Sequence, residues 1–510
     1  MSGEGANKVT TQPAAAPAEA SIARNTVFAL LVQATTAAFT AATTLVVIRL
    51  LGPEDFGIFS LAFGLAAIAG LVARFGVQAS VARFIAESRS DPLRCAVLAR
   101  DGLRLVLLTA FLAAAALVVA APAIATAYGD SSLVWPLRGM AISLIAETVL
   151  ALYLSTFAAL ARVSVNLRLV FIESVAEMTA TLALVVAGLG AAGAAFGRAI
   201  GYGVGAAIAV VAVVRILGRV SGAVWTREGS AGSTRRIVRY AFPLFVLDGL
   251  YGLYTRVDVL LVGALVSTTA VGVFAAPRRL LAPFEGIGLA VSNSVAPRQT
   301  SSGEGPRVDA LTAGIRWLVI LHAAFVPLLV VWAKPITDVL FGTKYSDSAA
   351  VLRWLAPYVL LTGINPLVSN TVNFLGRAGR RIPIALAALA VTVAIDVVLL
   401  PRIGVKAAAI GLSAGLWVYV PAHLYICWQE LSFPLRPIFL TLLRALVAAA
   451  AMAGILALVG GTETVSVGEA LLGVTLGLLA FGAILILTRE ISLRRPRRWL
   501  GLRRARLLKQ

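Results

Sequence analysis

Apolar runs long enough to cross a lipid bilayer recur along the whole chain. Runs of about 20 apolar residues are typical of transmembrane helices, whereas the strands of a membrane barrel need only about ten alternating residues. We therefore expect an all-α integral membrane protein. The pattern predicts fourteen spans, at 25–50, 57–74, 104–126, 134–160, 169–188, 191–214, 238–264, 271–296, 312–341, 349–375, 382–400, 404–428, 439–460 and 467–488.

Arginines between the spans alternate from loop to loop and so predict the topology. Cytoplasmic loops of membrane proteins carry an excess of basic residues. The even-numbered loops are basic, whereas the loop at 51–56 has no basic residue. The main basic groups are Arg83, Arg89, Arg94, Arg100 and Arg104 after the second span, Arg215, Arg219, Arg227, Arg235, Arg236 and Arg239 after the sixth, and Arg377, Arg380 and Arg381 after the tenth. This alternation predicts that both termini are cytoplasmic.

Composition agrees with this class and argues against others. The chain is 59% hydrophobic and 13% charged, and its net charge of +20 lies between the spans and in the tails. Topology explains such a charge better than nucleic-acid binding does, so we expect no nucleic-acid partner. Two cysteines and two histidines form no metal-ligand pattern, and we expect neither a metal nor another cofactor.

The second half of the chain repeats landmarks of the first at an offset of 213 to 215 residues. Pro122 and Gly129 correspond to Pro335 and Gly342 in this way. The other equivalent pairs are Gly190 with Gly404, Gly197 with Gly411, and Gly57 with Gly272. An offset near 214 equals six spans, so the two halves should have the same orientation, as in transporters built from parallel repeats.

The repeat suggests a domain organisation around two homologous six-helix lobes. We predict a disordered cytoplasmic tail at 1–24, lobes at 25–214 and 238–428, and a basic cytoplasmic linker at 215–237. Two additional transmembrane helices occupy 429–488, and a basic cytoplasmic tail occupies 489–510. The basic residues and leucines of this last tail predict contact with anionic lipid headgroups.

The stretch "RLLGPEDFG" at 49–57 interrupts two apolar runs and predicts a tight turn on the outer side. Pro53 suits the first position of the next helix, where its missing N–H is not needed. Glu54 and Asp55 then lie at the positive end of that helix, which favours acidic residues. The motif most simply shapes the turn, and a role in outer gating is the alternative.

Three stretches together resemble a known family: "RLLGPEDFGIFSLA", "RVDVLLVGALVSTTAVGVFAAPRRL" and "ITDVLFGTKYSDSAAVLRWLAPY". They are similar to the polysaccharide transporter family of lipid-linked oligosaccharide flippases, within the multidrug/oligosaccharidyl-lipid/polysaccharide superfamily. The resemblance implies two lobes around a central cavity and alternating access in the inner (plasma) membrane. It implies movement of an undecaprenyl-diphosphate-type oligosaccharide to the outer leaflet for surface polysaccharide biosynthesis. Glycan polymerases or glycosyltransferases are the protein partners that this function suggests.

Charged residues inside the spans are candidate functional residues, because a charge at mid-bilayer costs about 2.5–3.5 kcal/mol on insertion scales. The first lobe contains Arg74, Glu147, Glu173, Glu177 and Arg198. Glu173 and Glu177 share a helix face, which allows either a buried ion pair with Arg198 or a proton- or cation-coupling site. Glu147 is a further candidate for coupling.

The second lobe contains a further set of charges within its spans. These are Asp248, Arg256, Asp258, Arg278, Arg279, Glu285 and Asp396. Guanidinium groups bind phosphate in a bidentate manner, so Arg256, Arg278 and Arg279, with Arg74 and Arg198, are candidates for the substrate's anionic head. Pairing with Asp248, Asp258 or Glu285 is the alternative, and Asp258 is also a candidate for coupling.

Three other functions are weighed against this one. A peptidoglycan precursor flippase fits the span count equally well. An ion-coupled small-molecule or drug antiporter of the same superfamily is expected to have a carboxylate in its first span, but 25–50 has none. An enzyme is disfavoured, because the longest predicted outer loop has about eight residues and no catalytic set is evident.

Overall fold

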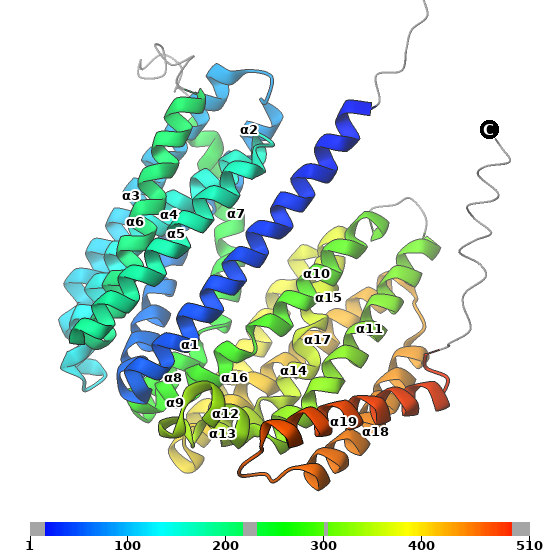
Figure 1. Cartoon of the computed structure of the whole chain (residues 1–510). Coiled ribbons are helices and arrows are strands. Elements are labelled where there is room, and N and C mark those ends of the chain that lie inside the picture. The colour runs from blue at the N-terminus through cyan, green and yellow to red at the C-terminus, as the bar shows by residue number, and fades with distance from the viewer. Residues whose placement is uncertain (1–15, 218–231, 300–303, 492–510) are drawn as a thin grey trace, which may run out of the picture. The chain divides into compact units, whose positions relative to one another are not determined.

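The structure is a computed structural model that describes residues 16–217, 232–299 and 304–491 (Figure 1). Every regular element within these residues is a helix, as the sequence predicts. The first half consists of α1 (Ala16–Arg74), α2 (Val77–Glu87), α3 (Pro92–Ala127), α4 (Val134–Ala159), α5 (Val163–Leu184) and α6 (Gly190–Leu217). A short π-helix, Val185–Leu189, joins α5 to α6.

The second half uses more and shorter helices for its six spans. These are α7 (Ser233–Tyr254), α8 (Val257–Leu265), α9 (Thr268–Leu280), α10 (Ala282–Gln299), α11 (Glu304–Val331), α12 (Ala333–Phe341), α13 (Ser348–Trp354), α14 (Ala356–Thr362), α15 (Ile364–Phe374), α16 (Arg381–Ile403) and α17 (Lys406–Leu431). Two further helices follow, α18 (Leu435–Val459) and α19 (Val467–Leu487).

All fourteen predicted spans are helical, but they differ in continuity. Among the described residues, nine helical stretches are long and apolar enough to cross a membrane, or ten if the bent pair at 348–374 is one span. Two of these stretches, Val27–Glu87 and Val163–Leu217, contain 61 and 55 residues and include two predicted spans each. The seventh and eighth predicted spans are each divided into two helices, near Arg256 and Leu281, and neither is among these stretches.

The predicted turn after the first span is present inside α1. Gly52 has φ 73° and ψ 175°, which is not helical, so two helices meet there. Pro53 then begins the second helix, where it disrupts no intrahelical hydrogen bond. At 1.5 Å per residue, 59 residues would measure roughly 90 Å as one straight helix, far more than a bilayer crossing requires.

The ends of the chain extend partly beyond the described residues. Helix α1 begins at Ala16, within the predicted 1–24 tail, and the rest of that tail lies outside the described residues. Most of the predicted 215–237 linker and of the 489–510 tail also lies outside them.

The internal repeat is visible in the backbone conformation. Gly129 and Gly342 both have positive φ, at 68° and 93°. Gly190, the first residue of α6, and Gly404, just before α17, also share positive φ, at 50° and 66°. A left-handed conformation favours glycine, so equivalent turns require glycine at equivalent positions. These shared conformations agree with the predicted repeat, which stays a prediction.

Glycines also set the close packing of one helix pair in each half. In the first half, α6 presents three glycines spaced four residues apart, and each faces a residue of α5. The facing pairs are Gly197 with Thr181, Gly201 with Glu177, and Gly205 with Glu173. In the second half, Gly411 faces Asp396 and Gly415 faces Thr392. Small residues let membrane helices approach closely, so in each half the helix that faces the glycines carries at least one buried acidic residue.

The described residues form two compact units that do not follow the two sequence halves. Unit 1 comprises residues up to 44, 69–119 and 138–245, and unit 2 comprises 45–68, 120–137 and the chain from 246 onwards. Unit 2 thus contains most of the second repeat together with two hairpin ends of the first.

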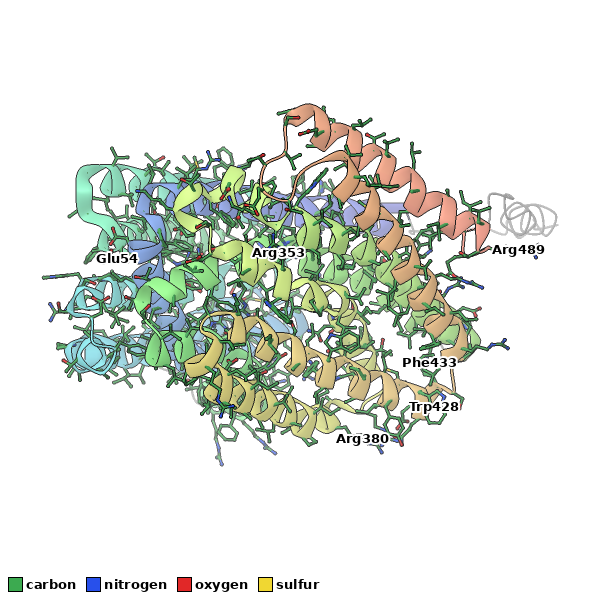
Figure 2. All side chains as sticks on the ribbon, turned by 90° about the horizontal axis from the view of Figure 1, so that it is seen from below. Glu54, Arg353, Arg380, Trp428, Phe433 and Arg489 are labelled. Atoms are coloured by element: carbon green, nitrogen blue, oxygen red, sulfur yellow. The ribbon has the colours of Figure 1, made fainter. Side chains whose placement is uncertain are left out.

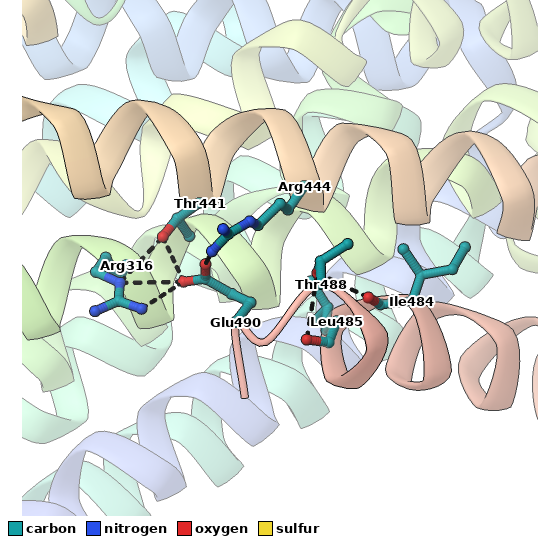
Figure 3. A network of polar contacts seen from close by, with 7 residues as sticks. All are labelled: Arg316, Thr441, Arg444, Ile484, Leu485, Thr488 and Glu490. Atoms are coloured by element: carbon teal, nitrogen blue, oxygen red, sulfur yellow. Dashed lines mark hydrogen bonds and ion pairs between the residues drawn. The ribbon is translucent and has the colours of Figure 1, made fainter. Parts of the chain in front are cut away.

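The last two helices are fixed to α11 within unit 2. The Glu490 carboxylate, only 1% exposed, accepts hydrogen bonds from Arg316 Nη2 of α11 and Arg444 Nη1 of α18, each at 2.7 Å (Figure 3). The Thr441 hydroxyl donates to the same carboxylate. Figure 2 shows Glu54 at one end of this unit and Arg380, Trp428 and Arg489 at the other. The basic 377–381 loop and the start of the basic tail therefore share one end, as the predicted topology requires.

We expect Glu490→Gln to lower the unfolding temperature of the detergent-purified protein by roughly 2–4 °C at neutral pH, because two guanidinium groups lose their charged partner. Burial alone would raise the pKa of Glu490, but hydrogen bonds from Thr441, Arg316 and Arg444 bring it below its usual value. The stabilisation is fully present above about pH 4.3 and is lost as the pH falls through the lower pKa of the folded protein. The difference between variant and wild type should therefore disappear at acidic pH.

Glu463→Gln is the matched control for this measurement. The Glu463 side chain is 72% exposed and lies 3.8 Å from the Lys334 ammonium. Exposed pairs of this kind contribute about 0–1 kcal/mol. Equal losses in both variants would contradict the assigned role of Glu490.

Candidate functional site

A network of ion pairs joins four helices of unit 1 and is centred on Arg198 of α6. Arg198 Nη1 lies 2.8 Å from Glu177 Oε1 of α5, and Arg198 Nη2 lies 3.3 Å from Glu147 Oε2 of α4. Arg74 Nη1 at the end of α1 lies 3.2 Å from the other oxygen of Glu147. The structure therefore brings Arg74, Glu147, Glu177 and Arg198 together, although they are far apart in sequence.

Tyr202 supports the central guanidinium one turn further along α6. Its hydroxyl lies 3.1 Å from Arg198 Nη2, and its ring centroid lies 4.4 Å from the guanidinium carbon. The Arg198 side chain is only 16% exposed. A guanidinium that is held by two carboxylates, a hydroxyl and an aromatic face is fixed in position rather than mobile.

Glu173 is the carboxylate of this network that has no cationic contact among the described residues. It is 5% exposed, and Ser174 donates to its Oε2 at 3.1 Å. Its Oε1 is buried and has no hydrogen-bond partner within the described part of the chain. Three carboxylates thus accompany two guanidinium groups, and within the described residues Glu173 is the one without an ion pair of 4 Å or less. Burying an unpaired charge is costly, so this position favours uptake of a proton or a cation.

A second network lies in unit 2, around Arg278 at the end of α9. Arg278 Nη1 is 3.4 Å from Asp258 Oδ2 of α8, and Arg278 Nη2 donates to the Thr255 carbonyl oxygen at 2.8 Å. Arg256 Nη1 donates to the Gly252 carbonyl oxygen and to the Thr255 hydroxyl, at 3.2 and 3.1 Å. Both arginines therefore meet at the break between α7 and α8, where carbonyls without helical partners are available.

Arg279 has a different environment from Arg278, although the two are consecutive. Its guanidinium lies over the rings of Phe56, Phe59 and Phe63, with centroid distances of 5.0, 5.4 and 5.5 Å. Consecutive helical residues point about 100° apart, so the two arginines contact different partners. The structure thus separates Arg279 from the pair formed by Arg278 and Asp258.

Asp396 of α16 is an acidic residue that the sequence did not single out among the candidates for coupling. It is fully buried, and neither carboxylate oxygen has a hydrogen-bond partner among the described residues. It lies near enough to Asp258 for the two carboxylates to repel each other. The facing glycine, Gly411, was a usable signal, because it packs directly on this side chain.

Two further acidic residues of the predicted spans are Glu285 and Asp248. Glu285 Oε1 accepts a hydrogen bond from the Tyr358 hydroxyl at 2.6 Å. The side chain of Asp248 lies outside the described residues. Within the described residues, no group of three or more histidine, cysteine, aspartate or glutamate side chains could hold a metal ion.

One curated relative matches part of the chain. The probable low-salt glycan biosynthesis flippase Agl15 of Haloferax volcanii is 20% identical over 245 residues, which are 47% of this chain and 51% of that protein. The matched region thus spans about half the length of this relative.

Solved membrane transporters share the fold over most of the chain. The lipid II flippase MurJ in an inward closed conformation has a TM-score of 0.67 at 13% identity, covering 91% of this chain and 99% of MurJ. An inward-facing multidrug resistance MATE family transporter of the MOP superfamily has a TM-score of 0.63 at 16% identity, covering 78% and 94%. An outward-facing transporter of this kind gives 0.56 at 14% identity, covering 81% and 95%.

The model of one protein family matches residues 22–300, which include the first repeat and the α7–α10 segment that holds Asp258, Arg278 and Arg279. This is more than half of the chain. The chain therefore belongs to the polysaccharide biosynthesis protein family.

Proposed function

We propose that the protein is a flippase that moves a lipid-linked, undecaprenyl-diphosphate-type oligosaccharide from the inner to the outer leaflet by alternating access. The family match over 22–300 is the observation that carries this proposal. A glycan biosynthesis flippase among its relatives and a lipid II flippase among its structural neighbours support it. In this proposal the chain is a transporter rather than an enzyme, and it serves surface polysaccharide biosynthesis in the plasma membrane with cytoplasmic termini.

The chemistry of the substrate agrees with arginines inside the bundle. A diphosphate must be shielded from hydrocarbon while the sugars cross and the lipid tail stays in the membrane. Arg278 and Arg256 offer permanently charged donors for phosphate, and both are already oriented by the α7–α8 break. We propose these two as the main anion ligands. Arg74 and Arg198 are weaker candidates, because Glu147 and Glu177 hold them in a network of ion pairs of 2.8 to 3.3 Å, whereas the pair of Arg278 with Asp258 is longer, at 3.4 Å. The packing of Arg279 on three phenylalanines supports a different role for it.

We propose that binding of a proton or a cation to acidic residues of the two units provides energy for transport. Three buried carboxylates, those of Glu173, Asp258 and Asp396, each have at least one oxygen without a hydrogen bond among the described residues. Glu147 and Glu177 lie near Glu173 and add further negative charge. Binding a proton or a cation would neutralise this charge, so occupancy can be coupled to a change of conformation. The membrane potential adds about 2.3 kcal/mol per charge per 100 mV to the outward movement of an anion.

We expect Arg278→Ala to reduce surface polysaccharide export at least about tenfold at matched expression, because the anion loses a bidentate donor and Asp258 loses its partner. Arg278→Lys should restore only part of the export, because an ammonium group cannot reproduce the planar fork. Arg353→Ala, at an exposed arginine that donates to the Val330 carbonyl oxygen, is the control and should export normally. Wild-type export by Arg278→Ala and Arg256→Ala would remove the proposed anion site.

The source of energy is tested by Glu173→Gln. In proteoliposomes, transfer of a fluorescent polyprenyl-diphosphate sugar between leaflets should lose its response to an imposed pH or sodium gradient, because the amide binds neither ion as a carboxylate does. The variant should keep its thermal stability, since no ion pair is broken. Glu177→Gln is the contrasting variant, because it removes a partner of Arg198 and should destabilise the protein as well. An unchanged gradient response in Glu173→Gln would exclude Glu173 from coupling.

A peptidoglycan precursor flippase is the second candidate, and a drug antiporter is the third. A peptidoglycan precursor flippase would rescue a bacterial strain depleted of its own precursor flippase. A drug antiporter would drive ethidium efflux from vesicles. Neither activity is expected if the substrate is a surface polysaccharide precursor.

A further inference from the structure

The two repeat motifs of the chain contact each other within unit 2. Residues Pro53 to Gly57 of α1 cross residues Thr268 to Gly272 of α9. A Cβ atom on Gly57 would collide with the Thr268 carbonyl oxygen, and one on Gly272 would collide with the Pro53 carbonyl oxygen. The crossing therefore has no room for any side chain at either glycine.

This contact is reciprocal in a way that follows the internal repeat. Gly57 is equivalent to Gly272 at an offset of 215 residues, and Pro53 is equivalent to Thr268 at the same offset. Each glycine thus meets the backbone four residues before its own counterpart. The contact is thus self-complementary, as contacts at a two-fold axis are.

Further bonds around the crossing also connect the first half of the sequence to the second. The Thr268 hydroxyl donates to Asp130 Oδ2 at 2.8 Å. Arg49 Nε donates to the Leu340 carbonyl oxygen at 2.9 Å, and the Tyr345 hydroxyl donates to the Ile48 carbonyl oxygen at 3.1 Å. All of these residues lie at or near hairpin ends that the topology places on the outer side.

Arg279 completes the same contact from the other end of α9. It lies seven residues after Gly272 and covers Phe56, Phe59 and Phe63, which follow Pro53 on α1. The preceding residue, Arg278, pairs with Asp258. One helix end therefore carries both a residue of the proposed substrate site and a residue of the crossing.

We propose that the Gly57–Gly272 crossing is the outer gate of the transporter and that Arg279 is a positioning residue that holds it closed. The inference rests on the proposed alternating access, in which the two halves must separate on the outer side to release the substrate. The contacts are suited to reversible opening, because close glycine packing and a cation over aromatic rings are individually weak. Adjacent Arg278 and Arg279 connect the state of the Asp258 site to the gate.

A reversible cross-link tests the gate directly. Asp130→Cys and Thr268→Cys are combined in a protein whose own Cys95 and Cys427 are replaced by alanine, since both are buried free thiols. Oxidation should link the pair and reduce transport at least about tenfold, and a reductant should restore it. Each single cysteine variant, treated with the same oxidant, should transport normally. Normal transport with a fully formed cross-link would overturn the proposal.

Glycine substitutions test the contact point by a separate measurement in detergent. Gly57→Ala and Gly272→Ala should each raise the labelling rate of a cysteine placed at buried Val271 by a water-soluble maleimide, by roughly tenfold, because overpacking opens the crossing. Gly454→Ala is the control, because a Cβ there meets nothing within 4 Å. Arg279→Gln should raise labelling, and Arg279→Lys should restore part of the closure.

These measurements separate failure of the gate from failure of the proposed function. Unchanged labelling in both glycine variants would overturn the gate, whatever the protein transports. Increased labelling in a protein that moves no lipid-linked sugar would leave the gate in place and reject the flippase. If size-exclusion chromatography shows that one glycine variant does not fold, the cross-linking experiment tests the gate instead.

Discussion

A charge placed in hydrocarbon must find a partner, and this requirement organises both units of the protein. Arg198 and Arg278 are each held by a carboxylate from a neighbouring helix and by a further oxygen atom. The ion pairs therefore fix the positions of several helices. They also leave Glu173 and Asp396 buried with carboxylate oxygens that no described residue satisfies. The same constraint that stabilises the bundle thus identifies where a mobile ion is most needed.

Glycine makes these charge contacts geometrically feasible. Arg198 follows Gly197 on α6, and the glycines of that helix let the backbone of α5 approach closely enough for Glu177 to reach the guanidinium. In the second half, Gly411 leaves room for the Asp396 carboxylate between the helices. A larger side chain at Gly197 or Gly201 would separate α5 from α6 and lengthen the ion pair of Arg198 with Glu177. Close packing and electrostatics therefore depend on each other in this fold.

Much of the architecture was predictable, because it depends on local sequence patterns. Apolar runs predict the spans, and the spacing of Gly129, Gly190, Gly342 and Gly404 predicts a repeat with which their shared positive φ agrees. The pairing of Arg198 with Glu177 was one of two interpretations of a shared helix face. The contact of Arg74 with Glu147 was not predictable, since it depends on how distant helices pack. The same holds for the rings around Arg279, because side-chain direction near a helix end follows from tertiary contacts.

The two repeats share a framework but differ in chemistry. At an offset of 215 residues, Glu177 of α5 corresponds to Thr392 of α16, and Thr181 corresponds to Asp396. Each half therefore places an acid against a glycine of the next helix, half-buried Glu177 in the first and buried Asp396 in the second, one helical turn apart. The first half surrounds its acids with two arginines, whereas the charged group that acts on Asp396 among the described residues is another carboxylate, Asp258. The two halves thus share the close packing that needs glycine, but they differ in the charged groups placed around it.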